Sequence, residues 1–147
     1  MNIVDCLYTA INNNINLTNK VVKIDIIEPL DFVLMGEPTL LKHVISNLLK
    51  NAIYSIMKAR KGSIEIYTSF TSDYSCLHIK DTGLGIPRKD RKRLFEPFYT
   101  TKDKGVGTGI GLAFCQMVMN MMHGTIELDS KENEYANFIL KFKKVSI

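Results

Sequence analysis

One long helical pattern constrains the fold of this 147-residue chain more than any other feature of the sequence. Over residues 37–58, apolar residues recur one turn apart and form a wide stripe along one side of a predicted helix. The stripe comprises positions 40, 41, 44, 45, 48, 49, 52, 53, 56 and 57. So broad an apolar face requires a second layer to cover it. Gly62 suits the C-terminal end of this helix.

The segments around this helix supply that second layer. Patterns typical of strands occupy residues 21–27, 31–36 (a short strand and turn), 63–70, 75–81, 125–129 and 136–142. Two further helices are predicted over 2–14 and 110–122. We therefore expect an α/β (α+β) two-layer sandwich, in which a mixed β-sheet carries helices packed on one face. The length fits a single domain over residues 1–147.

The composition excludes several classes of protein. Hydrophobic residues make up 46% and charged residues 23%, which is ordinary for a globular domain and excludes disordered and fibrous classes. No apolar run approaches the ~18–20 residues of a membrane helix, and the N-terminus carries no signal-peptide pattern. The three cysteines form no CxxC pair, so we expect neither a disulfide scaffold nor a zinc site.

The polar side of the long helix carries candidate ligands. His43, Asn47 and Asn51 are spaced by four residues and therefore share one face. Asn is a poor helix former, so two of them one turn apart invite an explanation. One interpretation is a solvated polar face. The other is a set of neutral oxygen ligands, which suit Mg²⁺.

A glycine-rich segment without regular pattern follows the predicted strand that ends at Asp81. An irregular stretch this long, residues 82–109, is usually functional or mobile. The turn Asp81-Thr82-Gly83-Leu84-Gly85-Ile86 allows three interpretations. It could be an ordinary turn, or an acceptor for an exocyclic amine such as that of adenine, or the Asp-Thr-Gly triplet of an aspartic protease. The protease needs two such triplets or a dimer, with a small residue after the triplet, and this chain has one copy, followed by Leu84.

Alternating glycines at residues 105–111 lead directly into a predicted helix. Exposed backbone N–H groups and the positive end of a helix dipole together favour an anion site. The spacing is neither that of a Walker A loop nor that of a dinucleotide-binding turn. A flexible hinge is the alternative. Before it, the aromatic stretch 94–102 either pins the loop to the body of the domain or contacts a ligand.

The order of these segments resembles the catalytic ATP-binding (HATPase, GHKL) domain of bacterial sensor histidine kinases. The segments that carry the resemblance are 47–52 (similar to the N box), 81–85 (G1 box), 95–98 (F box), 107–112 (G2 box) and 123–126 (the turn into the closing strands). Residues 112–119 look like those of quorum-sensing hybrid kinases. The resemblance implies the Bergerat ATP-binding fold, with a mobile ATP lid over about 87–106.

The resemblance also implies roles for individual residues. Asn51 matches the family's Mg²⁺-binding residue, Asp81 would bond the adenine amine, and Asn47, Asn51 and Lys102 would form the catalytic set. Tyr54 stands where many members carry Lys or Arg. The residues implied to bind ATP or ADP are Asn47, Asn51, Tyr54, Asp81, Gly83, Gly85, Ile86, Phe98, Thr101, Lys102, Gly107, Thr108, Gly109, Ile110, Gly111 and Leu112.

The residue at position 47 separates two kinds of chemistry. ATP-hydrolysing members of the superfamily carry Glu there, whereas the amide of Asn47 cannot act as a general base. We therefore expect donation of the γ-phosphoryl group to a histidine on a separate dimerisation domain. A GHKL-type regulatory module that binds ATP without phosphotransfer is the alternative.

None of the three histidines lies in a phosphoacceptor motif, so each is expected to have a local structural role. The dimerisation and phosphoacceptor domain is accordingly expected to be absent from this chain. The resemblance implies two partners, the dimerisation domain directly and a response regulator or receiver domain indirectly. It also implies a monomer in isolation that binds no nucleic acid, in the cytoplasm, with a parent protein anchored to the inner membrane.

The net charge of +4 is concentrated in one segment of the chain. Residues 80–104 hold eight basic and four acidic residues, so the whole excess lies on and beside the expected lid. A solvated loop is one interpretation of this run. The other is local attraction for a polyphosphate or for an acidic partner surface, which would strengthen at low salt.

Overall fold

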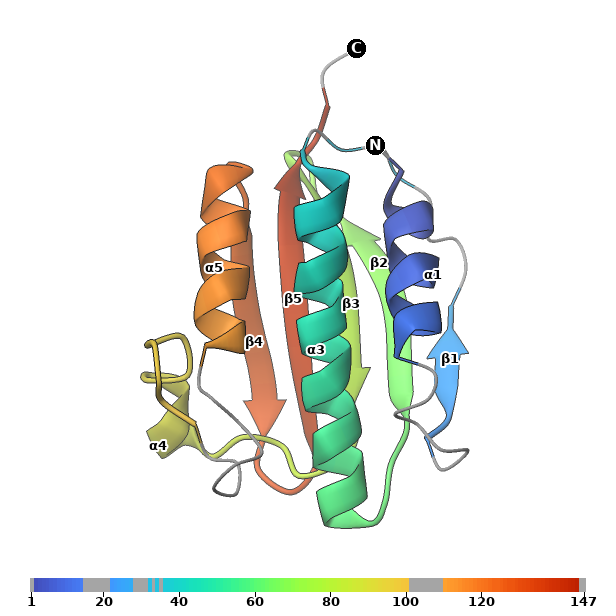
Figure 1. Ribbon diagram of the computed structural model, residues 1–147. Coiled ribbons are helices and arrows are strands. Elements are labelled where there is room, and N and C mark those ends of the chain that lie inside the picture. The colour runs from blue at the N-terminus through green and yellow to red at the C-terminus, as the bar shows by residue number, and fades with distance from the viewer. Residues whose placement is uncertain are drawn as a thin grey trace.

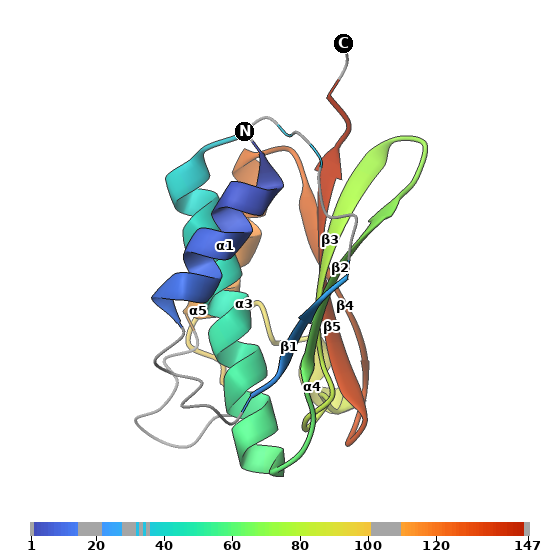
Figure 2. The same ribbon diagram turned by 90° about the vertical axis from the view of Figure 1, so that its right-hand side faces the viewer.

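A five-stranded mixed sheet and a layer of helices make up the fold (Figures 1 and 2). The computed structural model describes residues 2–14, 22–27, 32, 34, 36–100 and 110–145. The strands are β1 (Ile24–Ile26), β2 (Ile64–Phe70), β3 (Tyr74–Asp81), β4 (Thr125–Lys131) and β5 (Tyr135–Lys143). Their order in the sheet is β1-β2-β3-β5-β4, with β1 parallel to β2 and the other neighbours antiparallel.

The three long helices lie together on one face of the sheet, as Figure 2 shows. They are α1 (Ile3–Asn13), α3 (Pro38–Ala59) and α5 (Gly111–Met121), and a single-turn helix, α4 (Arg88–Arg91), lies apart from them. No helix within the described residues is long and apolar enough to cross a membrane. The predicted two-layer α/β sandwich, with a mixed sheet and helices on one face, is confirmed.

Helix α3 forms where the apolar stripe predicts it. Eight of the ten stripe positions are buried, whereas Leu40 is partly buried and Met57 is exposed. Its buried residues are Leu41, Val44, Ile45, Leu48, Leu49, Ala52, Ile53 and Ile56. At its start, the Glu37 carboxylate accepts a hydrogen bond from the Thr39 N–H at 3.0 Å, and Pro38 occupies the first turn, where its missing N–H is no loss. Packing against the sheet, rather than helix propensity, supplies most of its stability.

The expectation that Gly62 ends this helix is wrong by two residues. The helix ends at Ala59, and Arg60 takes the left-handed conformation with φ of 56°. Gly62 instead meets a close approach, because a Cβ there would overlap the backbone carbonyl oxygen of Thr82. The glycine is therefore needed where the chain passes the end of β3.

The inward side chains of the central strands form the core beneath α3. They alternate along each strand and include Ile64 and Ile66 of β2, Leu77 and Ile79 of β3, and Phe138 and Leu140 of β5. Asp81 occupies the next inward position on β3, after Leu77 and Ile79. The strand thus carries a carboxylate to the edge of an apolar core.

Two smaller segments differ from expectation. Residues 31, 33 and 35 of the expected strand over 31–36 lie outside the described residues. Phe32 and Leu34 are buried but belong to no strand, and the Phe32 ring packs 5.8 Å from that of Phe142. Helix α4 was not expected, since a single turn is too short to show periodicity.

Candidate functional site

Three segments meet along the polar side of α3. Asn47, Asn51 and Ser55 lie one turn apart on this helix. A Cβ built on Gly83 would lie 2.6 Å from the Ser55 hydroxyl, and one on Gly111 would lie 3.1 Å from Asn47 Oδ1. The C-terminal half of α3 therefore faces the turn after β3 at Ser55. About two turns earlier, at Asn47, the same helix faces the start of α5.

Asp81 is the buried acid of this site, with 3% of its surface exposed. Its Oδ1 accepts hydrogen bonds from the Ser55 hydroxyl at 2.9 Å and from the Gly83 N–H at 3.1 Å. Burial raises the pKa of the Asp81 carboxyl from 3.8 to about 6, and the two hydrogen bonds oppose that increase. Both donors reach the same oxygen, so they orient the carboxylate without engaging Oδ2.

Ser55 links the helix to the turn that follows Asp81. Its hydroxyl donates to Asp81 and accepts from the Leu84 N–H at 2.8 Å. Gly83 is required here, since any side chain would collide with Ser55. The sequence reasoning did not identify Ser55. The available signal was the spacing of four residues, which continues from Asn47 and Asn51 to Ser55.

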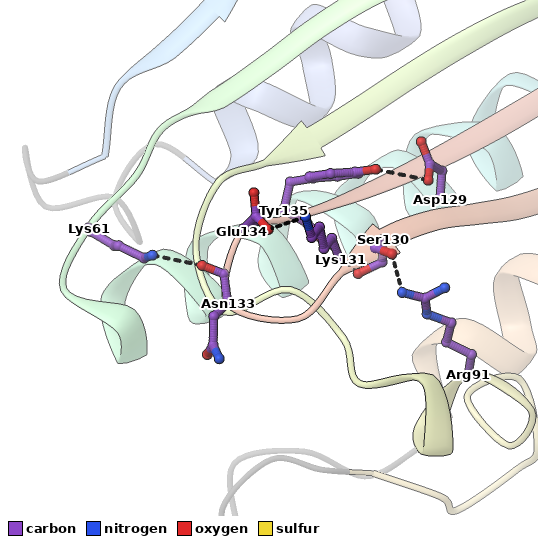
Figure 3. A network of polar contacts seen from close by, with 8 residues as sticks. All are labelled: Lys61, Arg91, Asp129, Ser130, Lys131, Asn133, Glu134 and Tyr135. Carbon is purple, nitrogen blue, oxygen red and sulfur yellow. Dashed lines mark hydrogen bonds and ion pairs between the residues drawn. The ribbon is translucent and has the colours of Figure 1, made fainter.

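The same turn is held on its other side by the hairpin between β4 and β5, whose side chains Figure 3 shows. Gly85 has φ of 64°, and a Cβ on it would overlap the carbonyl oxygen of Lys131. The Asn133 N–H donates to the Leu84 carbonyl at 2.6 Å, and the Lys61 amine donates to the Asn133 carbonyl at 2.8 Å. The turn at 83–86 is therefore fixed by contacts from both the helix and the hairpin.

The amides on α3 differ from a purely solvated polar face. Asn47 and Asn51 are both half-buried. The Asn47 amide donates to the His43 carbonyl at 3.0 Å, which leaves its Oδ1 on the side of Gly111. Within the described residues, no group of three His, Cys, Asp or Glu side chains is arranged to hold a metal ion. A metal at this site would depend on neutral amide oxygen, water and ligand oxygens, which is a mode that Mg²⁺ accepts.

The start of α5 offers backbone N–H groups toward this region. Ile110 is the N-cap residue and Gly111 the first helical residue, and among the described residues no side chain caps this end. Ile110 is half-exposed, and Leu112 packs partly against the core. The other expected phosphate-binding residues lie outside the described residues: Thr101, Lys102, Gly107, Thr108 and Gly109.

The aromatic residues of the stretch 94–100 differ in their burial. Phe95 packs partly against the core, whereas Phe98 is 75% exposed with φ of 69°. Tyr99 donates a hydrogen bond from its hydroxyl to Asp90 at 2.6 Å, and its ring lies 4.6 Å beneath the Arg93 guanidinium. Pinning to the body is therefore confirmed for Phe95, and a ligand contact by Phe98 stays a prediction.

Two further expected residues belong to the same segments. Ile86 is half-buried against the core at the end of the turn, and Tyr54 is half-buried on α3, beside Ser55 in sequence. The structure thus brings together Asn47, Asn51, Ser55, Asp81, Gly83 and Gly111 through direct contacts or helical spacing.

His78 illustrates the structural role expected of the histidines. It is buried in β3, where its ring stacks 4.3 Å from that of Tyr67. Nε2 lies 2.7 Å from the Ser69 hydroxyl and Nδ1 lies 3.2 Å from the Asn137 amide nitrogen. Burial lowers the pKa of His78, so its ring is held neutral in a local network.

Known proteins share both the sequence and the shape of this chain. Sensor histidine kinase RcsC of Salmonella typhimurium is 41% identical over 113 residues, which is 74% of this chain and 12% of RcsC. The CAI-1 autoinducer sensor kinase/phosphatase CqsS of Vibrio cholerae is 34% identical over 123 residues, covering 84% of this chain and 17% of CqsS. The chain thus spans less than a fifth of the length of these two relatives.

A solved catalytic domain of histidine kinase ThkA superposes with a TM-score of 0.80, at 25% identity, over 98% of this chain and 93% of that one. Residues 36–146 match the family described as "Histidine kinase-, DNA gyrase B-, and HSP90-like ATPase". This segment includes Asn47, Asn51, Asp81 and Gly111, which the structure places around α3. The chain therefore belongs to the family of histidine kinase-, DNA gyrase B- and HSP90-like ATPases, as the catalytic ATP-binding module found in sensor histidine kinases.

Proposed function

We propose that this chain binds Mg-ATP along α3 and donates the γ-phosphoryl group to a histidine on the dimerisation domain of a two-component kinase. The observation that carries the proposal is the position of Asp81. It is a buried carboxylate at the end of β3, oriented by Ser55 and Gly83. Helix α3, which carries Ser55, also faces the N-terminus of α5 at Gly111. Among the described residues, no side chain caps that N-terminus. One end of this arrangement suits a base and the other a polyphosphate.

The adenine would be recognised by Asp81 Oδ2. Oδ1 already accepts two hydrogen bonds, so an exocyclic amine at the other oxygen would complete the carboxylate's hydrogen bonding. An ionised carboxylate only accepts hydrogen bonds, so it favours adenine, whose C6 carries an amine, over guanine, whose C6 carries a carbonyl oxygen. Gly83, Gly85 and Ile86 would border the base, because they form the turn that Asp81 begins.

The phosphates would lie at the start of α5, where backbone N–H groups and the helix dipole attract anions. Gly107, Thr108, Gly109, Thr101 and Lys102 would add contacts from the lid. Asn51 would hold Mg²⁺ through its amide oxygen, one turn from Asn47. When bound, Mg²⁺ would neutralise charge on the transferred phosphoryl group.

Asn47 favours transfer over hydrolysis. Its amide is engaged with the His43 carbonyl and cannot take a proton from water. The chain would then supply position and charge stabilisation, while the acceptor comes from a separate dimerisation domain. A receiver domain would take the phosphoryl group in turn. The alternative, an ATP-binding regulatory module without transfer, shares every binding residue and differs only in this last step.

Incubation with γ-labelled ATP, Mg²⁺ and the dimerisation domain of the cognate kinase tests the proposal. We expect acid-labile, base-stable label on the histidine of the dimerisation domain, and none when Asn51→Ala replaces the wild type. Binding of ATP without any labelled histidine would instead support the regulatory module. An absence of ATP binding would refute both.

A further inference from the structure

The hairpin between β4 and β5 contacts the proposed adenine turn through residues outside every sequence motif described above. Figure 3 shows the side chains of the hairpin together with those of Arg91 and Lys61, which contact it. Ser130, near the end of β4, is 6% exposed and points to the core side of the sheet. Its hydroxyl accepts from the Ile86 N–H at 2.8 Å and donates to the Tyr135 carbonyl at 2.8 Å. A single hydroxyl thus ties Ile86 to both strands of the hairpin.

Arg91 makes a second tie from α4. Its guanidinium donates through Nε to the Ile86 carbonyl at 3.4 Å and through Nη2 to the Ser130 carbonyl. Ile86 is therefore held at its N–H by Ser130 and at its carbonyl by Arg91. Arg91 belongs to the basic segment that follows the turn. Its hydrogen bond to Ser130 therefore also attaches the start of this segment to β4.

The hairpin tip has a defined shape of its own. The Lys131 amine lies 2.8 Å from the Glu134 carboxylate, and the Tyr135 hydroxyl donates to Asp129 at 3.1 Å. The tip reaches Leu84 through the Asn133 N–H. Residues 84, 85 and 86 are thus each restrained by the hairpin, either by a hydrogen bond or by the absence of room for a side chain at Gly85.

We propose that Ser130 and Arg91 are positioning residues for adenine recognition. They hold the backbone of Ile86 against one side of the base without touching the nucleotide themselves. This inference rests on the proposed function, because it assumes that adenine lies beside Asp81 and Ile86. Loss of either residue lets the turn move relative to Asp81, which is fixed separately by Ser55 and Gly83. Adenine affinity and selectivity over guanine therefore both fall.

A purely structural role for Ser130 makes a different prediction. General destabilisation lowers the melting temperature and the folded fraction, but it leaves the ratio of the dissociation constants for GDP and ADP unchanged. A displaced turn changes that ratio, because it lets the base shift relative to the fixed Asp81 carboxylate, which is the group that distinguishes adenine from guanine. The selectivity ratio of the folded protein is therefore the readout that separates the two roles.

The experiment measures Mg-ADP and Mg-GDP binding calorimetrically in Ser130→Ala, with Ser75→Ala as the matched control. Ser75 is also 6% exposed and faces the core, but it lies at the opposite end of β3 from Asp81. We expect Ser130→Ala to weaken ADP binding about fivefold to tenfold, as the loss of one or two hydrogen bonds would, and to lower selectivity. Ser75→Ala should keep wild-type selectivity, and Ser130→Thr, which retains the hydroxyl, should restore most of it.

Arg91→Ala, compared with Arg88→Ala, gives a second test of the positioning role. This test can be made even if Ser130→Ala fails to fold. Both substitutions remove one positive charge from α4, so any general attraction for phosphate falls equally in the two. Only Arg91→Ala should reduce the selectivity ratio. Equal ratios in the two arginine variants and in the wild type would overturn the positioning role of Arg91.

The outcome for the wild type separates this inference from the proposed function. A wild-type chain that does not bind Mg-ADP overturns both. A wild type that binds Mg-ADP, together with selectivity unchanged in Ser130→Ala and in Arg91→Ala, overturns the positioning role alone.

Discussion

Replacing Asp81 by Asn should remove a pH dependence of stability that the burial of this carboxyl creates. Burial raises the pKa of Asp81 from 3.8 to about 6 in the folded protein. The folded state therefore binds the proton more tightly than the unfolded state, and ionisation of Asp81 opposes folding. This penalty is absent below about pH 3, grows as the pH rises from there through about 6, and is nearly complete at pH 7.

The size of the penalty follows from the shift. One pKa unit corresponds to about 1.4 kcal/mol, so a rise from 3.8 to about 6 amounts to about 3 kcal/mol of stability lost by pH 7. Only 3% of the residue is exposed, so screening by solvent does not reduce this figure much. The amide side chain in Asp81→Asn would carry no charge at any pH, and its contribution to the free energy of unfolding should not change with pH.

Urea unfolding of the wild type and Asp81→Asn at pH 4, 5, 6 and 7, followed by circular dichroism, measures the effect. The free energy of unfolding of Asp81→Asn minus that of the wild type should increase by about 2 kcal/mol from pH 4 to pH 7. Asp73→Asn, an exposed change of the same chemistry in the loop between β2 and β3, gives the effect of losing one surface charge. A difference between wild type and Asp81→Asn that stays constant across this pH range would refute the reasoning.

Three further predictions concern the site and the core. At pH 8, Asp81→Asn should weaken Mg-ADP binding about a hundredfold by calorimetry, because Ser55 and Gly83 would orient the amide oxygen toward themselves and its NH₂ group toward the adenine amine; wild-type affinity would disprove the assigned base site. Asn51→Ala should bind ATP with little dependence on Mg²⁺ in titrations with and without the metal, and a wild-type response to Mg²⁺ would remove Asn51 as its ligand. Cys115 is fully buried, and burial raises the pKa of its thiol to about 12, so it should react with iodoacetamide only after unfolding in urea. Rapid labelling of Cys115 in the folded protein would contradict this burial.

Much of the fold follows from local periodicity. The apolar stripe of α3 and the alternation in β2, β3 and β5 are strong signals, because each reports which face of a regular element is buried. The end of α3 at Arg60 was not predictable in this way. It depends on a left-handed arginine, while Gly62 serves a contact with Thr82 that brings together residues far apart in sequence.

The candidate site also contains residues that the sequence indicates and residues that only the folded structure identifies. Asn47, Asn51, Asp81 and the glycines were identified because their types and spacing are unusual in regular elements. Ser55 and Ser130 carry no such signature, since a lone serine occurs in many surroundings. Their contacts reach 26 and 44 residues along the chain, to Asp81 and Ile86, and only the folded structure brings those segments together.

The polar side of α3 constrains the length of any ligand that contacts both of its ends. Asn47, Asn51 and Ser55 stand on one continuous helix whose opposite side is fixed in the core. The distance from Asn47 to Ser55 along the axis is about 12 Å, set by the rise per residue. In the proposed site, the helix would therefore set a fixed distance between the base and the phosphates. Rearrangement of the loops could change how fast a ligand enters or leaves, but it could not change the spacing that the ligand must match.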